Sequence, residues 1–315
     1  MGFMRTLVAV AGVAVLLAAA CGGPAAPKRT GTGTRPTAPA ASSASSSPSN
    51  APASGGTSAG AAAGPAVPRF AHVIVVVEEN HAAGEVIGNP AAPFLNSVAR
   101  HGALLTRSYA ITHPSYPNYL ALFSGSTHGI TDDSCPHYFS GGNLGAQLRA
   151  RGFSFAGYAD GLPRAGYRGC SHGAFARRHA PWIDFRTVPR RLSHPMSSFP
   201  TDFAKLPRLA FVIPNLDHDM HDGTIGQADR WLRAKLSRYL AWARTHDSLL
   251  VVTWDEDDKS AGNHIPTMLA GAHVRAGRYA TRVDHYRLLR TLEASFGLAG
   301  LGHATQRRPL TTVWK

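Results

Sequence analysis

Three apolar segments of the chain end in acidic and amide residues, which are side chains that can hold a divalent cation. The segments read VVVEEN at 75–80, FVIPNLDHDMH at 211–221 and VVTWDEDD at 251–258. In open α/β sheets, sites form beyond the carboxyl ends of the strands, so we expect these three polar ends to converge. Carboxylates brought together need a compensating charge, and a divalent cation supplies it. The pattern therefore predicts a metal site.

Three histidines lie in or near these clusters and extend the possible ligand set. They are His218, His221 and His264. Imidazole nitrogen suits zinc or another first-row metal better than calcium, which prefers oxygen ligands. The sequence does not fix the identity of the metal.

The segment THPSYPNY at 112–119 places Ser115 directly before a predicted helix at 116–123. A helix N-terminus presents free N–H groups and a partial positive charge, which suit an arriving phosphate. The same environment, or a bound metal, stabilises a serine alkoxide. Alone, such a serine is more often an N-cap, and an acidic strand end is more often a solvated turn. Their combination favours nucleophilic chemistry on a phosphate ester.

Apolar strands alternate with helices along the rest of the chain. This order predicts a three-layer α/β/α sandwich with a mostly parallel sheet. The predicted strands are 72–77, 153–158, 209–213, 249–254 and 265–270, and the predicted helices are 93–102, 116–123, 144–151, 227–245 and 286–296.

Composition divides the chain into three parts. Residues 1–21 read as a signal peptide, with Arg5, an apolar run at 7–20 and small residues before Cys21, as in a lipoprotein cleavage site. Ordinary signal cleavage, with Cys21 incidental, remains open. Residues 22–68 are rich in Ala, Pro, Ser, Thr and Gly and predict a disordered linker. We expect residues 69–315 to form the catalytic domain of an exported protein, either a cell-surface lipoprotein or a secreted one.

The chain carries a formal net charge of +13, which favours anionic partners. Its arginines are scattered and no basic run alternates with aromatic residues, so we expect no specific nucleic-acid partner. A small phosphate ester is the expected substrate, and any membrane contact would be through a lipid on Cys21. Cys135 and Cys170 remain, and in an exported domain they predict one disulfide, with two free thiols as the alternative.

The motifs as a set resemble the phosphoesterase family of bacterial and fungal acid phosphatases and bacterial phospholipases C, within the alkaline-phosphatase-like superfamily. The resemblance extends from about residue 72 to about residue 301. Its most specific motifs are VVVEENH at 75–81, HPSYPNYL at 113–120, DMHDG at 219–223 and TWDE at 253–256, with RRHAPWIDF at 177–185 and NHIPTMLAGAHV at 263–274 as further matches. The acid phosphatase branch is the most similar.

The resemblance implies a role for each matching residue. Ser115 matches the nucleophile, and His221, His264 and His113 match positions that transfer a proton or orient the nucleophile. A second group lines the substrate site. It comprises Asn118, Asp219 and His218. The implied ligands of a divalent metal are Glu79, Asn80, Ser115, Asp255 and Glu256.

One departure from the family and two alternative functions remain. Asp257-Asp258-Lys259 stands where phospholipase-like members tend to have His-Gly-Gly, which speaks against a phospholipase C. A phosphodiesterase or phospholipase C is still the alternative within this class. A lipid-tethered, non-catalytic polyanion-binding protein is the alternative from another class, because the tether and the positive charge fit it.

Overall fold

The computed structural model describes residues 66–315. The predicted signal peptide, Cys21 and nearly all of the predicted linker lie outside the described residues. Within residues 66–315, no helix is both long enough and apolar enough to cross a membrane.

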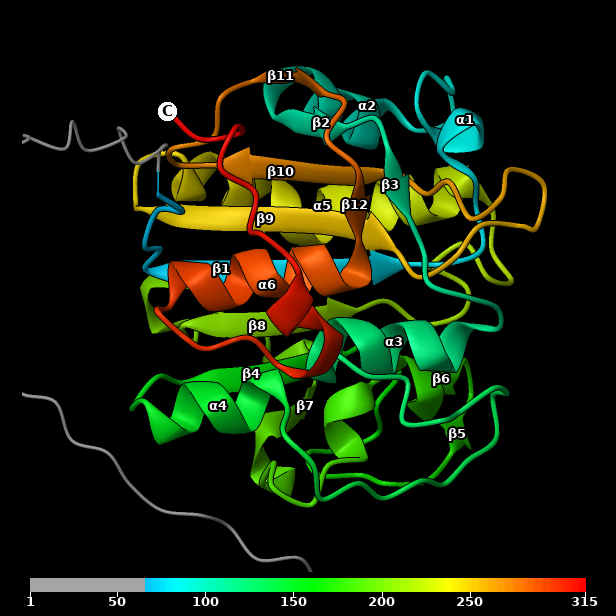
Figure 1. Ribbon diagram of the computed structural model, residues 1–315. Helices are drawn as coiled ribbons and strands as arrows, with labels where there is room; N and C mark the ends of the chain where they lie inside the picture. Colours follow the sequence, from blue (N-terminus) through cyan, green and yellow to red (C-terminus); the bar gives the residue numbers. More distant parts are fainter. Residues whose placement is uncertain (1–65) are drawn as a thin grey trace, which may run out of the picture. The chain divides into compact units, whose positions relative to one another are not determined.

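An eight-stranded sheet forms the centre of the fold, in the order β11-β2-β10-β9-β1-β8-β4-β7 (Figure 1). Its strands are β1 (His72–Glu78), β2 (Ala103–Leu105), β4 (Phe155–Ala159), β7 (Ser193–Pro195), β8 (Leu209–Ile213), β9 (Ser248–Trp254), β10 (Thr267–Gly271) and β11 (Gly277–Tyr279). All pairings are parallel except those of β10 with β9 and β2. Two small pairs lie outside this sheet, β3 (Ser108–Tyr109) with β12 (Val283–Asp284) and β5 (Ser171–His172) with β6 (Phe175–Ala176).

Strand β1 is buried on both faces, which explains its continuous run of β-branched residues. Val73, Val75 and Val77 belong to one apolar core, whereas Ile74 and Val76 belong to a second core on the other face. Successive side chains of a strand point to opposite faces, so a single strand contributes to both cores.

Helices cover both faces of the sheet (Figure 1). On one face lie α3 (Ser115–Ser124), α4 (Leu144–Ala150) and α6 (His285–Ser295), and on the other lie α2 (Pro93–His101) and α5 (Ile225–Ala243). Short helical turns complete the described part: α1 (Ala83–Val86), η1 (Arg177–His179), η2 (Pro181–Ile183), η3 (Arg190–Leu192), η4 (Met196–Ser198), η5 (Phe203–Lys205) and η6 (Gly302–Gln306). The arrangement confirms the predicted α/β fold with a mostly parallel sheet.

The helix boundaries follow from capping residues. The Thr224 hydroxyl accepts a hydrogen bond from the Gln227 N–H and begins α5 two residues before the predicted position. The Asp284 carboxylate does the same for α6 through the Arg287 N–H. Helix α3 begins at Ser115 itself, after Pro114, so the serine is the first helical residue. It therefore lies within the first turn of the helix rather than in the loop before it.

Candidate active site

Ser115 lies between two carboxylates that come from the ends of different strands. Its Oγ atom is 3.0 Å from Oε2 of Glu79, the residue after β1, and 3.2 Å from Oε1 of Glu256, two residues after β9. All three side chains are buried. The parallel pairing of β1 with β9 brings these two strand ends to the same edge of the sheet. The predicted convergence of the serine with this pair of carboxylates is therefore present in the structure.

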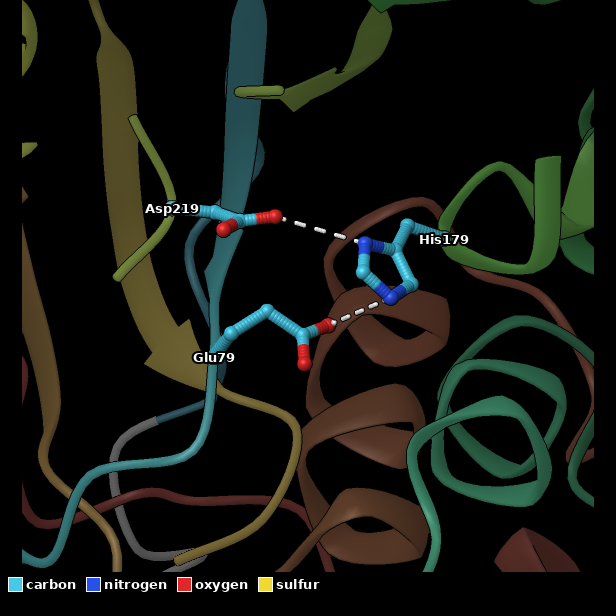
Figure 2. A group of neighbouring side chains, drawn as sticks. All are labelled: Glu79, His179 and Asp219. Atoms are coloured by element: carbon cyan, nitrogen blue, oxygen red, sulfur yellow. Dashed lines mark ion pairs between the residues drawn. The ribbon is translucent and has the colours of Figure 1, made fainter. Parts of the chain in front are cut away.

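A histidine that we did not select from the sequence completes the buried cluster. Figure 2 shows the ring of His179 between the carboxylates of Glu79 and Asp219. Its Nε2 atom is 3.1 Å from Glu79 Oε1 and its Nδ1 atom is 3.3 Å from Asp219 Oδ2. The ring stacks on Tyr119 of α3, whose hydroxyl donates a 2.5 Å hydrogen bond to Glu79. Together, Glu79, His179 and Asp219 form a group that could hold a metal ion.

The ends of β1 and β9 are also joined by Asp255 and Asn80. The Asn80 N–H donates to Asp255 Oδ1 at 3.3 Å. Asn80 has a φ of 53°, in the left-handed region that asparagine tolerates better than most residues. This turn directs the chain away from β1 directly after Glu79.

Burial controls the charge of this cluster. It raises the pKa of Asp255 to about 7 and that of Asp219 to about 7. Burial, followed by the negative charge of Asp255, raises the pKa of Glu256 to about 8. Burial and the charges of Asp255 and Asp219 raise the pKa of Glu79 well above its usual value. Burial lowers the pKa of His179 well below its usual value, so its ring is neutral and able to act as a ligand.

The cluster fits a divalent cation on the basis of its own contacts. Asp219 Oδ2, Asp255 Oδ2 and His179 Nε2 are buried and have no hydrogen-bond partner among residues 66–315. The close approach of His179 to Glu79 thus lacks hydrogen-bond geometry. Buried polar atoms without partners are rare, and a cation held by Glu79, His179 and Asp219 would satisfy the atoms of His179 and Asp219. Mixed carboxylate and imidazole donors suit zinc and other first-row metals.

Next to Ser115 along the chain, His113 contacts two carboxylates of the β9 end. Its Nδ1 atom is 2.7 Å from Glu256 Oε2 and its Nε2 atom is 3.2 Å from Asp257 Oδ1. The side chain is 27% exposed, so it is accessible from solvent as well as from the buried cluster. Asp257 also accepts hydrogen bonds from the backbone N–H groups of Lys259, Ala261 and Asn263, which order the loop after β9.

Asn118 organises the segment before Ser115. Its side-chain oxygen accepts from the N–H groups of Ile111 and Thr112 at 3.0 and 3.1 Å, and its amide donates to Thr112 O at 2.8 Å and to Pro114 O at 3.2 Å. These bonds engage the amide oxygen and both of its N–H groups. The contacts show that Asn118 orders the segment that leads into Ser115, and its contact with substrate stays a prediction.

The N-terminus of α3 offers fewer free donors than the sequence suggested. Asp133 accepts the Tyr116 N–H at 2.9 Å, and Pro117 has no N–H group. The Tyr116 N–H is therefore occupied, and Pro117 supplies none. Phosphate binding at the start of α3 stays a prediction.

His221 lies at the margin of the buried cluster. Its backbone N–H donates to Asp219 Oδ1 at 2.9 Å, and its Nδ1 atom is 2.7 Å from Asp222 Oδ1. Its Nε2 atom is 3.2 Å from a terminal nitrogen of Arg178. Because arginine can only donate, Nε2 accepts in this contact. The predicted role of His221 in proton transfer stays a prediction.

Two further histidines have partners outside the cluster. His264 Nε2 is 3.0 Å from the backbone oxygen of Thr106, and its ring packs on Tyr109. His218 Nδ1 is 2.8 Å from Asp160, and its ring stacks on Trp231. Neither ring contacts Ser115 or the carboxylates around it. Their predicted roles in proton transfer and substrate binding stay predictions that depend on rearrangement.

A disulfide joins the two loops beneath this site. Cys135 and Cys170 are bonded, with their Cα atoms 5.8 Å apart. The first loop supplies Asp133, which caps α3, and the Cys170 carbonyl accepts the Arg177 N–H at the start of η1. The bridge therefore links the loop that contacts the start of α3, where Ser115 lies, to the loop that contacts η1, where His179 lies.

Comparison with known proteins places the chain in a family. The model of the "Phosphoesterase family" matches residues 88–299. The chain is similar to a phosphatidylinositol-3-phosphatase of Mycobacterium tuberculosis, with 52% identity over 254 residues that cover 79% of this chain and 84% of the relative. It is also similar to a phosphate-repressible acid phosphatase of Penicillium chrysogenum, with 32% identity, 66% of this chain covered and 55% of the relative. An acid phosphatase of Aspergillus niger is 33% identical, with 67% of this chain and 56% of the relative covered. The chain therefore spans a little over half the length of these two fungal relatives.

Solved structures show the same fold at low sequence identity. A protein of the alkaline phosphatase superfamily from Vibrio parahaemolyticus has a TM-score of 0.52 and 14% identity, with coverage of 78% of this chain and 72% of that one. A phosphonate monoester hydrolase from Silicibacter pomeroyi has a TM-score of 0.51 and 12% identity, with 78% of each chain covered. Together with the family match, the relatives favour an enzyme over a non-catalytic binding protein. The chain belongs to the phosphoesterase family and is an acid-phosphatase-like hydrolase of phosphate esters.

Proposed function

We propose that the protein is a metal-dependent phosphomonoesterase with Ser115 as its nucleophile. The observation that carries the proposal is the position of Ser115 Oγ, 3.0 Å from Glu79 and 3.2 Å from Glu256 within a buried cluster of carboxylates. A serine that only caps a helix has no need of two buried acidic partners. Once ionised, either carboxylate can accept the serine proton as the oxygen attacks phosphorus.

The proposed metal ligands come from five segments of the chain. They are Glu79, Asp219 and His179, which form the candidate metal group, together with Asp255 and Glu256 after β9 and Ser115 at the start of α3. When bound, a divalent cation would stabilise the serine alkoxide and the negative charge of the phosphate. The orphaned atoms Asp255 Oδ2 and Asp219 Oδ2 support this ligand set.

We assign the proton for the leaving group to His113. It contacts the same Glu256 carboxylate as Ser115 does, and it is partly exposed. A general acid must reach the departing oxygen, which a position at the boundary of the cluster allows. The ring nitrogens of His221 and His264 contact Arg178 and Thr106 rather than a carboxylate that touches Ser115, so they fit this role less well.

We infer that the substrate is a phosphomonoester, and that a phosphate on a lipid headgroup is one natural form of it. The similarity to the mycobacterial phosphatidylinositol-3-phosphatase supports the second part. The net charge of +13 favours anionic substrates and anionic surfaces. Export, with a lipid on Cys21, would place the enzyme at such a surface, and the Cys135–Cys170 bridge is typical of an oxidising compartment.

The proposal is tested by a substrate panel with matched variants. The purified protein should hydrolyse p-nitrophenyl phosphate and phosphatidylinositol 3-phosphate faster than bis(p-nitrophenyl) phosphate or phosphatidylcholine. EDTA should abolish the activity, and a divalent metal should restore it. Ser115→Ala should be inactive, whereas Ser124→Ala, at the other end of α3, should remain active. Preference for the diester would contradict the monoesterase assignment.

A further inference from the structure

A cavity separate from the carboxylate cluster lies beside β7, the edge strand of the sheet. Its volume is about 310 Å³, within the range of about 300–1,000 Å³ that is typical of small-ligand sites. None of the residues proposed for catalysis or metal binding lines it. Its lining includes a basic group and an apolar group of side chains. The basic group is Arg168, Arg186 and Arg190, and the apolar group is Trp182, Ile183, Phe185 and Val188.

The apolar wall of the cavity is firmly fixed. Trp182 is 1% exposed, and its indole N–H donates to Ser193 Oγ at 3.0 Å, so it needs no partner from a ligand. The Trp182 ring lies directly on β4 at Gly157, where an added Cβ atom would come 2.1 Å from the ring. Such a close approach is possible only with glycine at that position. Trp182 therefore anchors the wall, and Ile183 and Val188, each 7% exposed, present its accessible hydrocarbon.

The other side of the cavity carries positive charge without compensation. No acidic residue lines it, and within residues 66–315 none of Arg168, Arg186 and Arg190 forms an ion pair with a carboxylate. The buried Nε atom of Arg168 has no hydrogen-bond partner there. The nearby acid, Asp184, is already bound by Arg177 and by the Tyr116 hydroxyl.

Two of these arginines are held in place by an aromatic ring instead of by carboxylates. The guanidinium carbons of Arg168 and Arg186 lie 4.6 and 5.1 Å from the ring centroid of Tyr138. Contacts with a ring face fix the orientation of a guanidinium without using its N–H groups. One terminal nitrogen of Arg168 donates to the Ile183 carbonyl oxygen at 3.2 Å, and the remaining donors are available for an anion.

We propose that this cavity binds an amphiphile with one alkyl chain and one anionic headgroup. The headgroup binds the guanidinium groups of Arg168, Arg186 and Arg190, and the chain packs on Ile183 and Val188. Charge complementarity selects the anion, because arginine forms strong bonds with carboxylate and phosphate oxygens. The apolar wall selects the chain. The inference does not depend on Ser115 or on the proposed hydrolysis.

Isothermal titration calorimetry of the full chain tests the proposal below the micelle concentration of each probe. Decanoate represents a fatty acid, and decanoyl-lysophosphatidylglycerol represents a lysophospholipid. Either probe should bind, and the tighter one identifies the source. From hexanoate to octanoate to decanoate, affinity should rise about fourfold for each methylene group. Decanol, which lacks the charge, and acetate, which lacks the chain, should bind at least about tenfold more weakly than decanoate.

Variants locate the binding. Arg186→Gln/Arg190→Gln should weaken decanoate binding about tenfold. The matched control is Arg233→Gln/Arg238→Gln, which removes two exposed arginines from α5 on the opposite face of the sheet and should have no effect. Val188→Trp, which fills the cavity, should abolish binding while the melting temperature reports its folding. Equal affinity in both double variants, or in decanol and decanoate, would overturn the proposal.

Discussion

Two adjacent glutamates at the end of β1 are equally buried but differ in whether they contact the candidate site. Glu78 and Glu79 are both fully buried at the end of β1, but their side chains point to opposite faces. Glu79 contacts Ser115 and His179, whereas neither oxygen of Glu78 has a hydrogen-bond partner among the described residues. Burial, and then the charges of Asp219 and Asp229, raise the pKa of Glu78 well above its usual value.

Glu79→Gln should lower kcat for p-nitrophenyl phosphate about 100-fold or more, because it removes a ligand of the proposed cation. Glu78→Gln is the matched control. It should keep kcat within about threefold, because Glu78 contributes no charge to Ser115. Metal content, measured on the same preparations, should fall only in the Glu79 variant. Equal losses in both variants would mean that the strand end acts through stability alone.

His113→Gln should distinguish a proton donor from a structural histidine. A general acid matters most when the leaving group is a poor one. We expect kcat to fall about 100-fold for glycerol phosphate but less than about tenfold for p-nitrophenyl phosphate, whose phenolate departs without help. His221→Gln should lower both rates to a similar extent. The assignment of His113 fails if its variant also affects both substrates equally.

The sequence predicted the carboxylates of the site better than its histidines. Glu79 and Asp255 follow long apolar strands, so strand topology alone indicated that they meet. His179 lies in η1, a three-residue turn without a periodic pattern, and only its place in RRHAPWIDF could have pointed to it. The position of such a turn depends on tertiary contacts, here stacking on Tyr119 and a disulfide-linked loop.

At the scale of elements, the disulfide holds together two loops that support α3 and η1. It closes a segment with a sequence separation of 35 residues. Cys135→Ser/Cys170→Ser should therefore lower the free energy of unfolding by about 2–4 kcal/mol. Urea denaturation measures this change, and wild-type protein treated with a reducing agent is the control that should match the variant. An unchanged midpoint would mean that other contacts hold the two loops.

The long elements of the fold were predictable, but its edges were not. Strands β1, β8 and β9 are continuous apolar runs, and each was predicted within one residue of its observed bounds. Strands β2 and β7 have three residues each, too few to show a period. The antiparallel direction of β10 is likewise set by its neighbours β9 and β2 and not by its own sequence. Local sequence patterns therefore predicted the long helices and strands that build the layers. The order of the strands in the sheet depends on tertiary pairing, which local patterns do not show.

At the scale of the whole molecule, the buried carboxylates of the site lower the free energy of unfolding when no cation neutralises their charge. The folded-state pKa of Asp255 is about 7, above its ordinary value, so the folded protein keeps a proton that the unfolded chain releases near pH 4. For an acid with a raised pKa, stability falls as pH rises between these two values. Asp219 acts in the same direction, whereas buried neutral His179 acts in the opposite one.

We therefore expect Asp255→Asn to gain melting temperature relative to wild type as the pH rises from 5 to 8, with both proteins kept free of metal by a chelator. A change of at least about 3 °C is expected for a domain of this size. Saturating metal should reverse the difference, since it stabilises only the chain that binds it. Differential scanning calorimetry at both pH values measures all four conditions. A difference that does not depend on pH would contradict the proposed protonation of Asp255.

The most direct test of the nucleophile is to trap the phosphoryl group on the enzyme. The protein, with metal, is mixed with p-nitrophenyl phosphate and quenched in acid within one turnover, and its reduced tryptic peptides are analysed by mass spectrometry. The account predicts one phosphoryl group on peptide 108–149, located at Ser115 by fragmentation, and none in Ser115→Ala. Full hydrolytic activity in the Ser115→Ala variant, or a phosphoryl group trapped on another residue, would contradict it.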